Sequence, residues 1–234
     1  MTLLRHFALV TFDVDPDALV RTLPTGLRPE LRTLDDGRLR GFVSAVSFRD
    51  IDFRFHGAEL VRATFDQTNY RAYVFGPDGK RAVFFFETTL DSRLALIPRR
   101  LWGMPWYGGR TTIEAEWDGD RCLSYRHVCS GSRNAVDAAF IGTTALAGRL
   151  DGFADADETF AVLTHPLDGF YRHPDGRIGR YSVWHPRLRP TLGTAVRAQY
   201  AAFGRLGLVA ADSAPHSILL QPSIEFDVQL PPTV

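Results

Sequence analysis

Arginine supplies nearly all of the positive charge in this 234-residue chain. There are 26 arginines and one lysine, Lys80, and together they balance 27 acidic residues. A guanidinium stays protonated at any working pH, so arginine holds anions and does not form covalent amine adducts. The composition therefore excludes most lysine-based chemistry and directs the search towards anion binding.

The densest group of such residues spans 98–110, where the adjacent Arg99 and Arg100 precede several aromatic side chains that include Tyr107. Guanidinium groups match the oxygens of carboxylates and phosphates, and aromatic rings provide apolar walls for a binding site. The same pattern is also typical of a helix C-terminus whose cations interact with the helix dipole. Only one of two adjacent helical residues is expected to face inward.

Two further charged residues interrupt apolar strands. Glu87 directly follows the apolar run 83–86, so partial burial would raise its pKa and suit it to proton transfer. It would equally suit the polar end of a core strand, paired with an arginine. Arg71 shares one strand face with Asn69 and Tyr73, which fits either a cavity lining or a solvated exterior.

No metal or cofactor site is predicted. The seven histidines are scattered; His185 is the most notable because it ends a strand, although a solvated turn is the more common setting for such a residue. The chain contains no phosphate loop, nucleotide fingerprint or hydrolase elbow. Cys122 and Cys129 are seven residues apart on one expected strand, which should point them to opposite faces and leave both thiols free.

The surrounding pattern is mostly β. About ten strands and three or four short helices are expected, and most strands are joined by tight turns, which favours an antiparallel sheet closed into a barrel or folded over. The expected hairpin turns are 35–37, 76–79, 118–120 and 174–176. The main expected strands include 5–14, 60–75, 81–89, 107–117, 121–129, 134–144 and 217–230. The expected helices are a short one after Asp15, 91–102 with a kink at Pro98, 158–163, and 194–206.

The chain is interpreted as one domain, 1–234. Its zero net charge argues against a nucleic-acid partner. No apolar run is long enough for a membrane helix, and no signal peptide is recognisable, so we expect a cytoplasmic protein without a membrane partner. A homo-oligomer is compatible with the sequence.

Several segments, taken in order, resemble the YqjF-like family of uncharacterised bacterial proteins. They include Asn69-Tyr70-Arg71-Ala72-Tyr73-Val74, Val83-Phe84-Phe85-Phe86-Glu87, Met104-Pro105-Trp106-Tyr107, and Phe170-Tyr171-Arg172 through Trp184-His185-Pro186, together with residues 17–27. The resemblance covers nearly the whole chain. It adds Arg172 and His185 to the predicted ligand-binding residues.

That family is similar in fold to the acetoacetate decarboxylase-like superfamily. The resemblance implies a mainly β, cone-shaped barrel with a central pocket and a few short helices. In the decarboxylases, a Pro-Lys-Lys stretch supplies the amine that forms an imine with the substrate. The corresponding stretch here is taken to be 98–105, where both lysines are Arg99 and Arg100, so the imine mechanism is lost.

Three hypotheses follow. In the first, the pocket binds a small organic acid or a keto/enol compound. Arg71 with Arg99 or Arg100 holds the anion, Glu87 acts as acid/base or orients the ligand, and Tyr107 closes the pocket. Such a protein could catalyse a lyase or isomerase step without a Schiff base. In the second, the same pocket binds or senses a small molecule without catalysis. In the third, Glu87 and the arginines simply pair inside the barrel.

Overall fold

The computed structural model describes residues 2–54, 62–130 and 133–233, in which strands predominate and helices are short. The strands are β1 (Thr2–Val14), β2 (Arg28–Pro29), β3 (Leu31–Thr33), β4 (Leu39–Phe53), β5 (Ala63–Phe75), β6 (Arg81–Leu90), β7 (Trp106–Gly108), β8 (Arg110–Asp118), β9 (Arg121–Ser130), β10 (Val136–Leu146), β11 (Asp168–Arg172), β12 (Ile178–Trp184), β13 (Thr191–Tyr200) and β14 (Ser217–Thr233). The helices are α1 (Pro16–Thr22), α2 (Leu96–Trp102), α3 (Ala156–Leu163) and α4 (Ala201–Arg205), with a 3₁₀ turn at Arg93–Ala95.

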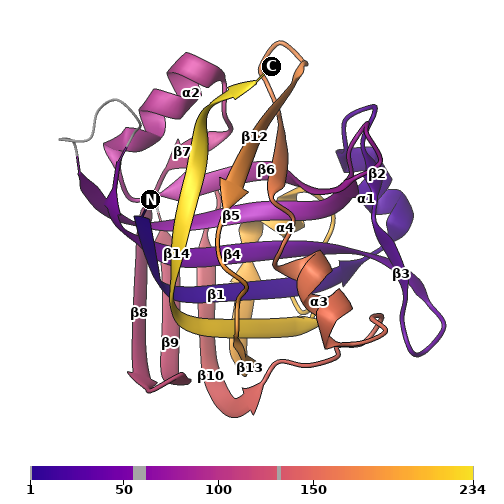
Figure 1. The fold of residues 1–234 in the computed structure, drawn as a ribbon, viewed down its shortest axis with the longest axis vertical. Coiled ribbons are helices and arrows are strands. Elements are labelled where there is room, and N and C mark those ends of the chain that lie inside the picture. Colours follow the sequence, from indigo (N-terminus) through magenta and orange to yellow (C-terminus); the bar gives the residue numbers. More distant parts are fainter. Residues whose placement is uncertain (1, 55–61, 131–132, 234) are drawn as a thin grey trace.

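The described strands form a single fourteen-stranded sheet that partly closes into a ring (Figure 1). Strand β1 pairs with both β4 and β14, so β1, β4, β5, β6, β11, β12 and β14 follow one another around the ring. Most pairings are antiparallel, but β6 pairs in parallel with β7 and with β11. The predicted mainly β architecture is confirmed, with a mixed sheet in place of a purely antiparallel one.

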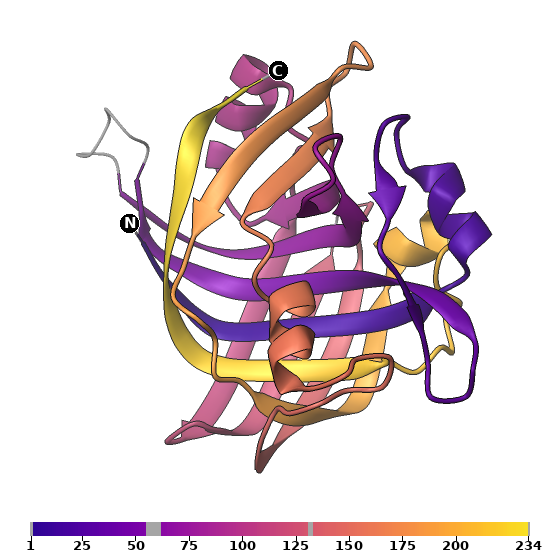
Figure 2. The same ribbon diagram turned by 45° about the vertical axis from the view of Figure 1, so that its right-hand side comes forward.

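The rest of the sheet folds back over the outside of the ring. Strands β8, β9, β10 and β13 lie behind β1, β4 and β5 and cross them (Figure 2). The layer between them is apolar and aromatic; Tyr70 of β5, for example, meets the rings of Tyr200 and Phe203 edge-on. Burial of these rings stabilises the contact between the two layers.

Side-chain alternation on β5 separates the ring interior from this outer layer. Tyr70, Ala72 and Val74 belong to the apolar cluster between the layers, whereas Asn69 and Arg71 line the interior. Helix α3 lies against the ring on the interior side, where the Leu163 carbonyl accepts a hydrogen bond from the Tyr73 hydroxyl at 3.1 Å.

The four predicted hairpin turns are confirmed, and so are the strands that they join, with the start of the predicted 60–75 strand lying outside the described residues. The helix predicted over 194–206 is wrong for its first half, because β13 continues to Tyr200 in register with β10 and only Ala201–Arg205 is helical. Tertiary pairing outweighs the helix propensity of the alanines. Before Pro98, a 3₁₀ turn leads into α2. Pro98 is the third residue of α2, and the first turn of a helix tolerates proline because the N–H groups there have no intrahelical partner.

The prediction that Cys122 and Cys129 face opposite sides is also wrong. Both side chains are buried in the cluster between the two layers, and neither forms a disulfide. A register shift in the β8–β9 pairing, between Glu116 and Trp117, leaves an extra residue on β9. Such a bulge reverses the alternation of side chains beyond it. None of the described helices is long and apolar enough to cross a membrane.

Candidate functional site

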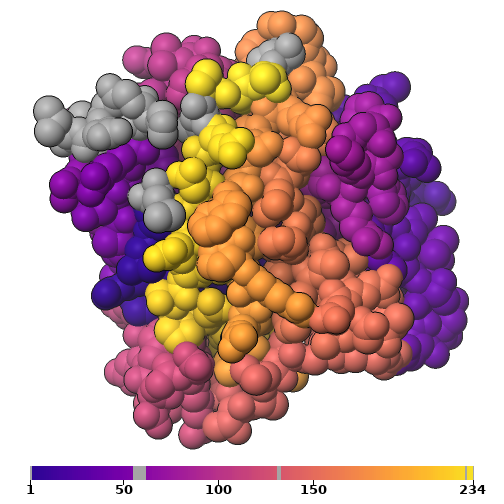
Figure 3. Space-filling view, viewed as in Figure 1, coloured from indigo at the N-terminus to yellow at the C-terminus, as the bar shows by residue number. Residues whose placement is uncertain are grey.

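A cavity of about 60 Å³ lies inside the ring, and all seven ring strands contribute to its lining. In the space-filling view, the orange residues of β12 and the yellow residues of β14 cover this side of the ring (Figure 3). Most of the lining is apolar or aromatic: Leu4, Phe7, Val46, Phe48, Phe53, Val83, Phe85, Trp106, Tyr181, Val183, Leu188, Ile224, Phe226 and Val228. A small number of polar groups in an apolar cavity is typical of a small-molecule site.

Three of the polar lining residues form a row on β5. Gln67, Asn69 and Arg71 occupy successive inward positions, with Asn69 opposite Val46 and Arg71 opposite Ser44 of β4. Because the β4–β5 pairing is regular here, their side chains enter the cavity from one wall. The prediction that Arg71 shares a face with Asn69 and Tyr73 is confirmed.

Arg71 is the cationic residue of the lining. One of its Nη2–H groups donates to the Leu163 carbonyl at the end of α3, at 2.8 Å, and its guanidinium lies 5.5 Å from the centre of the Tyr73 ring. Its Nε is buried and has no hydrogen-bond partner. Among the described residues, no carboxylate lies within ion-pair distance of Arg71, which therefore retains capacity to bind an anion.

His185 also lines the cavity, just beyond β12. Its ring stacks on Phe226, with 5.4 Å between the ring centres, and its Nδ1 donates to the Pro186 carbonyl at 2.9 Å. Burial lowers the pKa of His185, and the nearby His165 and Arg71 add to this effect, whereas hydrogen bonds to the backbone of Pro186 and Thr164 oppose it. The imidazole is therefore favoured in its neutral form and lies within the field of Arg71.

Two carboxyl groups, Asp50 and Asp168, and the hydroxyl residue Thr164 also belong to the polar lining. Burial raises the pKa of Asp50 to about 7, and a hydrogen bond from the Thr2 hydroxyl partly opposes the rise. Burial also acts on Asp168, but hydrogen bonds from Arg180 and Ser182 outweigh it and lower the pKa of that group. Asp50 lies six residues along β4 from Ser44, the partner of Arg71, or about 20 Å along the strand.

Glu87 does not line the cavity. The register of β5 and β6 shifts at this point, because Tyr70 pairs with Glu87 while Arg71 pairs with Phe85. The unpaired residue is Phe86, and this bulge turns the Glu87 side chain to the outer face of the ring. There, the buried carboxylate pairs with Arg133 and Arg205, each at 2.9 Å.

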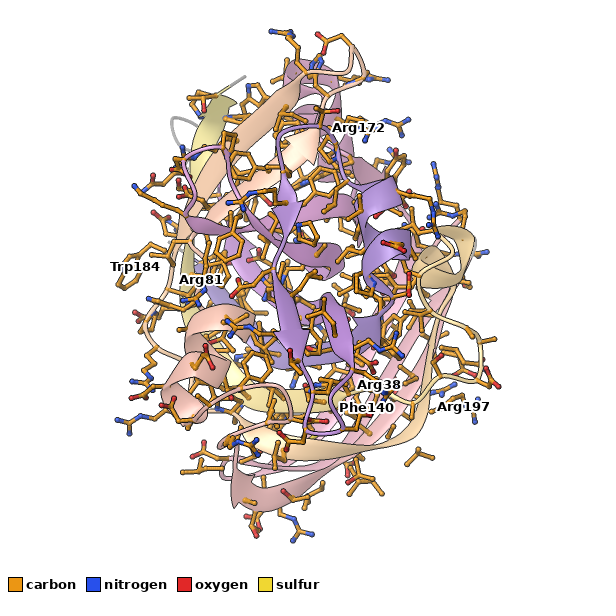
Figure 4. The ribbon with its side chains drawn as sticks, turned by 90° about the vertical axis from the view of Figure 1, so that its right-hand side faces the viewer. Arg38, Arg81, Phe140, Arg172, Trp184 and Arg197 are labelled. Atoms are coloured by element: carbon orange, nitrogen blue, oxygen red, sulfur yellow. The ribbon has the colours of Figure 1, made fainter. Side chains whose placement is uncertain are left out.

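Tyr107 and Arg99 belong to the same outer group. The guanidinium of Arg99 lies 4.7 Å from the centre of the Tyr107 ring, and that of Arg133 lies 5.2 Å from it. Arg100 is exposed on α2. Arg172 is exposed as well and lies at the periphery of the molecule (Figure 4).

The predicted site residues thus fall into separate places. Arg71 and His185 meet at the cavity; Glu87, Tyr107 and Arg99 meet outside it; Arg100 and Arg172 are on the surface. From the 98–110 segment, the residue that reaches the cavity is Trp106 on β7. Sequence reasoning missed Asp50, Gln67, Thr164 and Asp168. It placed Asn69 on the Arg71 face without assigning it a role, and the same strand alternation leads on to Gln67.

No group of three or more histidine, cysteine or acidic side chains in the described part of the chain could hold a metal ion. The only lysine of the sequence, Lys80, is exposed in the turn between β5 and β6, and its Nζ lies 4.0 Å from a carboxylate oxygen of Asp78. No lysine amine therefore lines the ring cavity.

The fold is that of the acetoacetate decarboxylase-like proteins. The chain is similar to the acetoacetate decarboxylase of Legionella pneumophila (TM-score 0.57, 13% identity, covering 99% of this chain and 85% of the other). It is also similar to the enduracididine biosynthesis enzyme MppR in complex with pyruvate (TM-score 0.56, 15% identity, 97% and 86%) and to an acetoacetate decarboxylase-like enzyme from Sphingomonas wittichii RW1 (TM-score 0.58, 13% identity, 96% and 89%).

Residues 2–225 match the family DUF2071, described as "Uncharacterized conserved protein (COG2071)". The chain belongs to this family. The predicted resemblance to an uncharacterised family with a decarboxylase-like fold is thereby confirmed. No curated protein matches the chain.

Proposed function

We propose that this protein binds a small organic acid in the ring cavity, with the carboxylate of the acid on Arg71. The observation that carries the proposal is the state of this side chain: a guanidinium that faces an apolar cavity, with a buried Nε that has no partner and no carboxylate beside it. A bound carboxylate would satisfy that group through charge-assisted hydrogen bonds.

The size of the cavity limits the ligand. A volume of about 60 Å³ has room for roughly four to six water-sized groups, which corresponds to an acid with a short carbon chain. MppR, one of the proteins with a similar fold, has been solved in complex with pyruvate, an acid of this size. The absence of lysine from the lining supports binding without an imine.

The test is binding of pyruvate, acetoacetate and propionate by calorimetry and thermal shift, with Arg71→Gln as the variant. A hydrogen bond to a charged group contributes about 1.5–3 kcal/mol, so Arg71→Gln should weaken binding at least tenfold. Arg100→Gln and Arg172→Gln are matched controls that should bind like the parent. The proposal fails if none of the acids binds, or if Arg71→Gln binds them as well as the parent does.

A second candidate function is proton transfer on the bound acid, and one observation favours it. His185 lines the same cavity, is favoured in its neutral form, and is close enough to Arg71 for the arginine charge to act on its pKa. A neutral imidazole that removes a proton next to a carbonyl would leave an enolate beside a guanidinium, which stabilises negative charge. Asp50 is less suited to this role because it lies at the far end of the cavity.

This activity is testable by NMR exchange of the methyl protons of pyruvate in D₂O. The parent should accelerate the exchange, and His185→Phe, which preserves the stacking on Phe226, should lose the acceleration while it still binds pyruvate. Binding without accelerated exchange in the parent would identify a binding protein and not an enzyme of this type.

A further inference from the structure

Asn69 is held in one orientation by its neighbours. Its Oδ1 accepts a hydrogen bond from Gln67 Nε2 and another from the Thr88 hydroxyl, both at 2.9 Å. Thr88 points into the ring because the bulge at Phe86 changes the alternation of β6. Two donors thus fix which end of the amide is the oxygen, and the other end, Nδ2, is a donor.

The Nδ2 group of Asn69 has no hydrogen-bond partner in the described part of the chain. Asn69 is half-buried and lines the cavity, two residues before Arg71 on the same strand face. Successive inward positions on a strand are about 6.6 Å apart, and the arginine side chain is long and flexible. A short acid held by Arg71 therefore lies within reach of the Asn69 amide.

We infer that Asn69 determines the specificity of the site by donating a hydrogen bond from Nδ2 to a second oxygen on the carbon chain of the bound acid. The inference rests on the proposed function, in which Arg71 holds the carboxylate. It narrows the ligand class from short acids in general to short oxo acids, whose carbonyl oxygen accepts this hydrogen bond. Asn69 is a binding residue in this scheme.

Discrimination arises from the cost of leaving the amide unpaired. A bound acid without a second oxygen displaces water from Nδ2 and supplies no acceptor, while the walls nearby are apolar. Sites built to hydrogen-bond a polar group of the substrate reject analogues that lack it more strongly than apolar pockets reject an extra methylene. We expect the affinity for an oxo acid to be about threefold to tenfold higher than that for the matching acid without the carbonyl, which corresponds to one net hydrogen bond.

The experiment compares pyruvate with propionate, which have the same charge and chain length and differ in one carbonyl. The dissociation constants of both acids are measured by calorimetry for the parent, Asn69→Ser and Arg71→Gln. We expect the parent to prefer pyruvate and Asn69→Ser to bind pyruvate no better than propionate. The affinity of Asn69→Ser for propionate should be equal to or higher than that of the parent, because no amide is left unpaired. Asn134→Ser, at the only other asparagine of the chain, is the matched control and should keep the preference.

Thr88→Val provides a second, independent variant if Asn69→Ser does not fold. It removes one of the two donors that orient the amide without touching the ligand, so the preference for pyruvate should decrease and the affinity for propionate should not. The inference is overturned if the parent binds both acids equally, or if Asn69→Ser and Thr88→Val leave the ratio unchanged. In those cases the proposed function still holds, provided that Arg71→Gln weakens the binding of both acids. If neither acid binds to the parent, both the proposed function and this inference are rejected.

Discussion

Phe85 and Glu87 are two residues apart on β6 and face opposite sides of the sheet. Phe85 pairs with Arg71 and lines the ring cavity, whereas Glu87 pairs with Tyr70 and points to the outer layer. The bulge at Phe86 is the cause, because one extra residue reverses the side-chain alternation. Because of the bulge at Phe86, the Phe85 ring lines the cavity and the Glu87 carboxylate joins the ion pairs on the outer face.

The first prediction concerns that cluster. Glu87→Gln keeps the size of the side chain but removes the charge that Arg133 and Arg205 share, so it should lower the free energy of unfolding by about 1–3 kcal/mol. Because Glu87 is outside the cavity, the affinity for pyruvate should not change. Urea unfolding and calorimetry on the same preparations measure both quantities. A loss of pyruvate binding or turnover with unchanged stability would instead support the catalytic role predicted for Glu87.

Local signals in the sequence were enough for much of the fold. The turns at 35–37, 76–79, 118–120 and 174–176 require glycine at a positive φ, and they place four hairpins correctly. Strand alternation alone groups Arg71 with Asn69 and Tyr73 on one face, but it does not show whether that face is the inner or the outer one. These features depend on residues close together in the chain, which is why composition and periodicity reveal them.

The rest of the site depends on contacts between distant segments. Regular strand alternation predicts that Glu87 lies on the same face as Phe85. The bulge at Phe86 breaks this alternation, and the residue types do not reveal it. Arg99 or the arginine after it was predicted to reach the pocket because the pair occupies the position taken to correspond to the lysines of the decarboxylases. Helix α2 lies on the surface instead. Of this segment, Trp106 is the residue that lines the cavity, and the parallel pairing of β7 with β6 holds it there. The direction of a short surface helix is a tertiary property that the residue types do not encode.

The second prediction concerns Asp50 and the change in stability from acidic to neutral pH. The pKa of this carboxyl is raised to about 7 by burial, so the folded state binds the proton more tightly than the unfolded state, whose pKa is near 3.8. Stability should therefore fall as pH rises from about 4 through 7, by a few kcal/mol in all. Asp50→Asn, which can still accept the hydrogen bond from Thr2, should remove this decline. The check is the free energy of unfolding from pH 5 to 8.5; parallel curves for parent and variant would contradict the buried, protonated carboxyl.

The third prediction has the opposite sign. His127 is fully buried between the two layers, where its ring nitrogens lie 3.1–3.2 Å from the hydroxyls of Ser47, Thr68 and Thr111. Burial lowers its pKa to about 3, so the unfolded state takes up the proton first as the pH falls.

Stability should therefore decrease from pH 6.5 downward, by about 2 kcal/mol at pH 5 from this group alone. His127→Gln should flatten the curve in this range at some cost in stability at neutral pH. An unchanged slope in His127→Gln would mean that His127 does not titrate in this way.

The last prediction concerns the length of the acid. Trp106 lines the cavity from β7, beside Thr88 of β6, and so its indole occupies space near the oxo end of an acid held by Arg71 and Asn69. Trp106→Ala should cost about 3–5 kcal/mol of stability and enlarge the cavity. Because the added space is apolar, acids with two or three more methylene groups should gain affinity relative to pyruvate, by up to about 0.8 kcal/mol for each methylene that is buried.

The measurement is a series of 2-oxo acids of increasing chain length, with affinities determined by calorimetry. Trp184→Ala is the matched control, because Trp184 is 47% exposed on β12 and lies at the periphery of the molecule (Figure 4). It should leave the chain-length profile unchanged. Trp106→Leu, a smaller perturbation, should shift the optimum in the same direction if Trp106→Ala is too unstable. An optimum that stays at three carbons in both Trp106 variants would show that other walls of the ring set the length of the ligand.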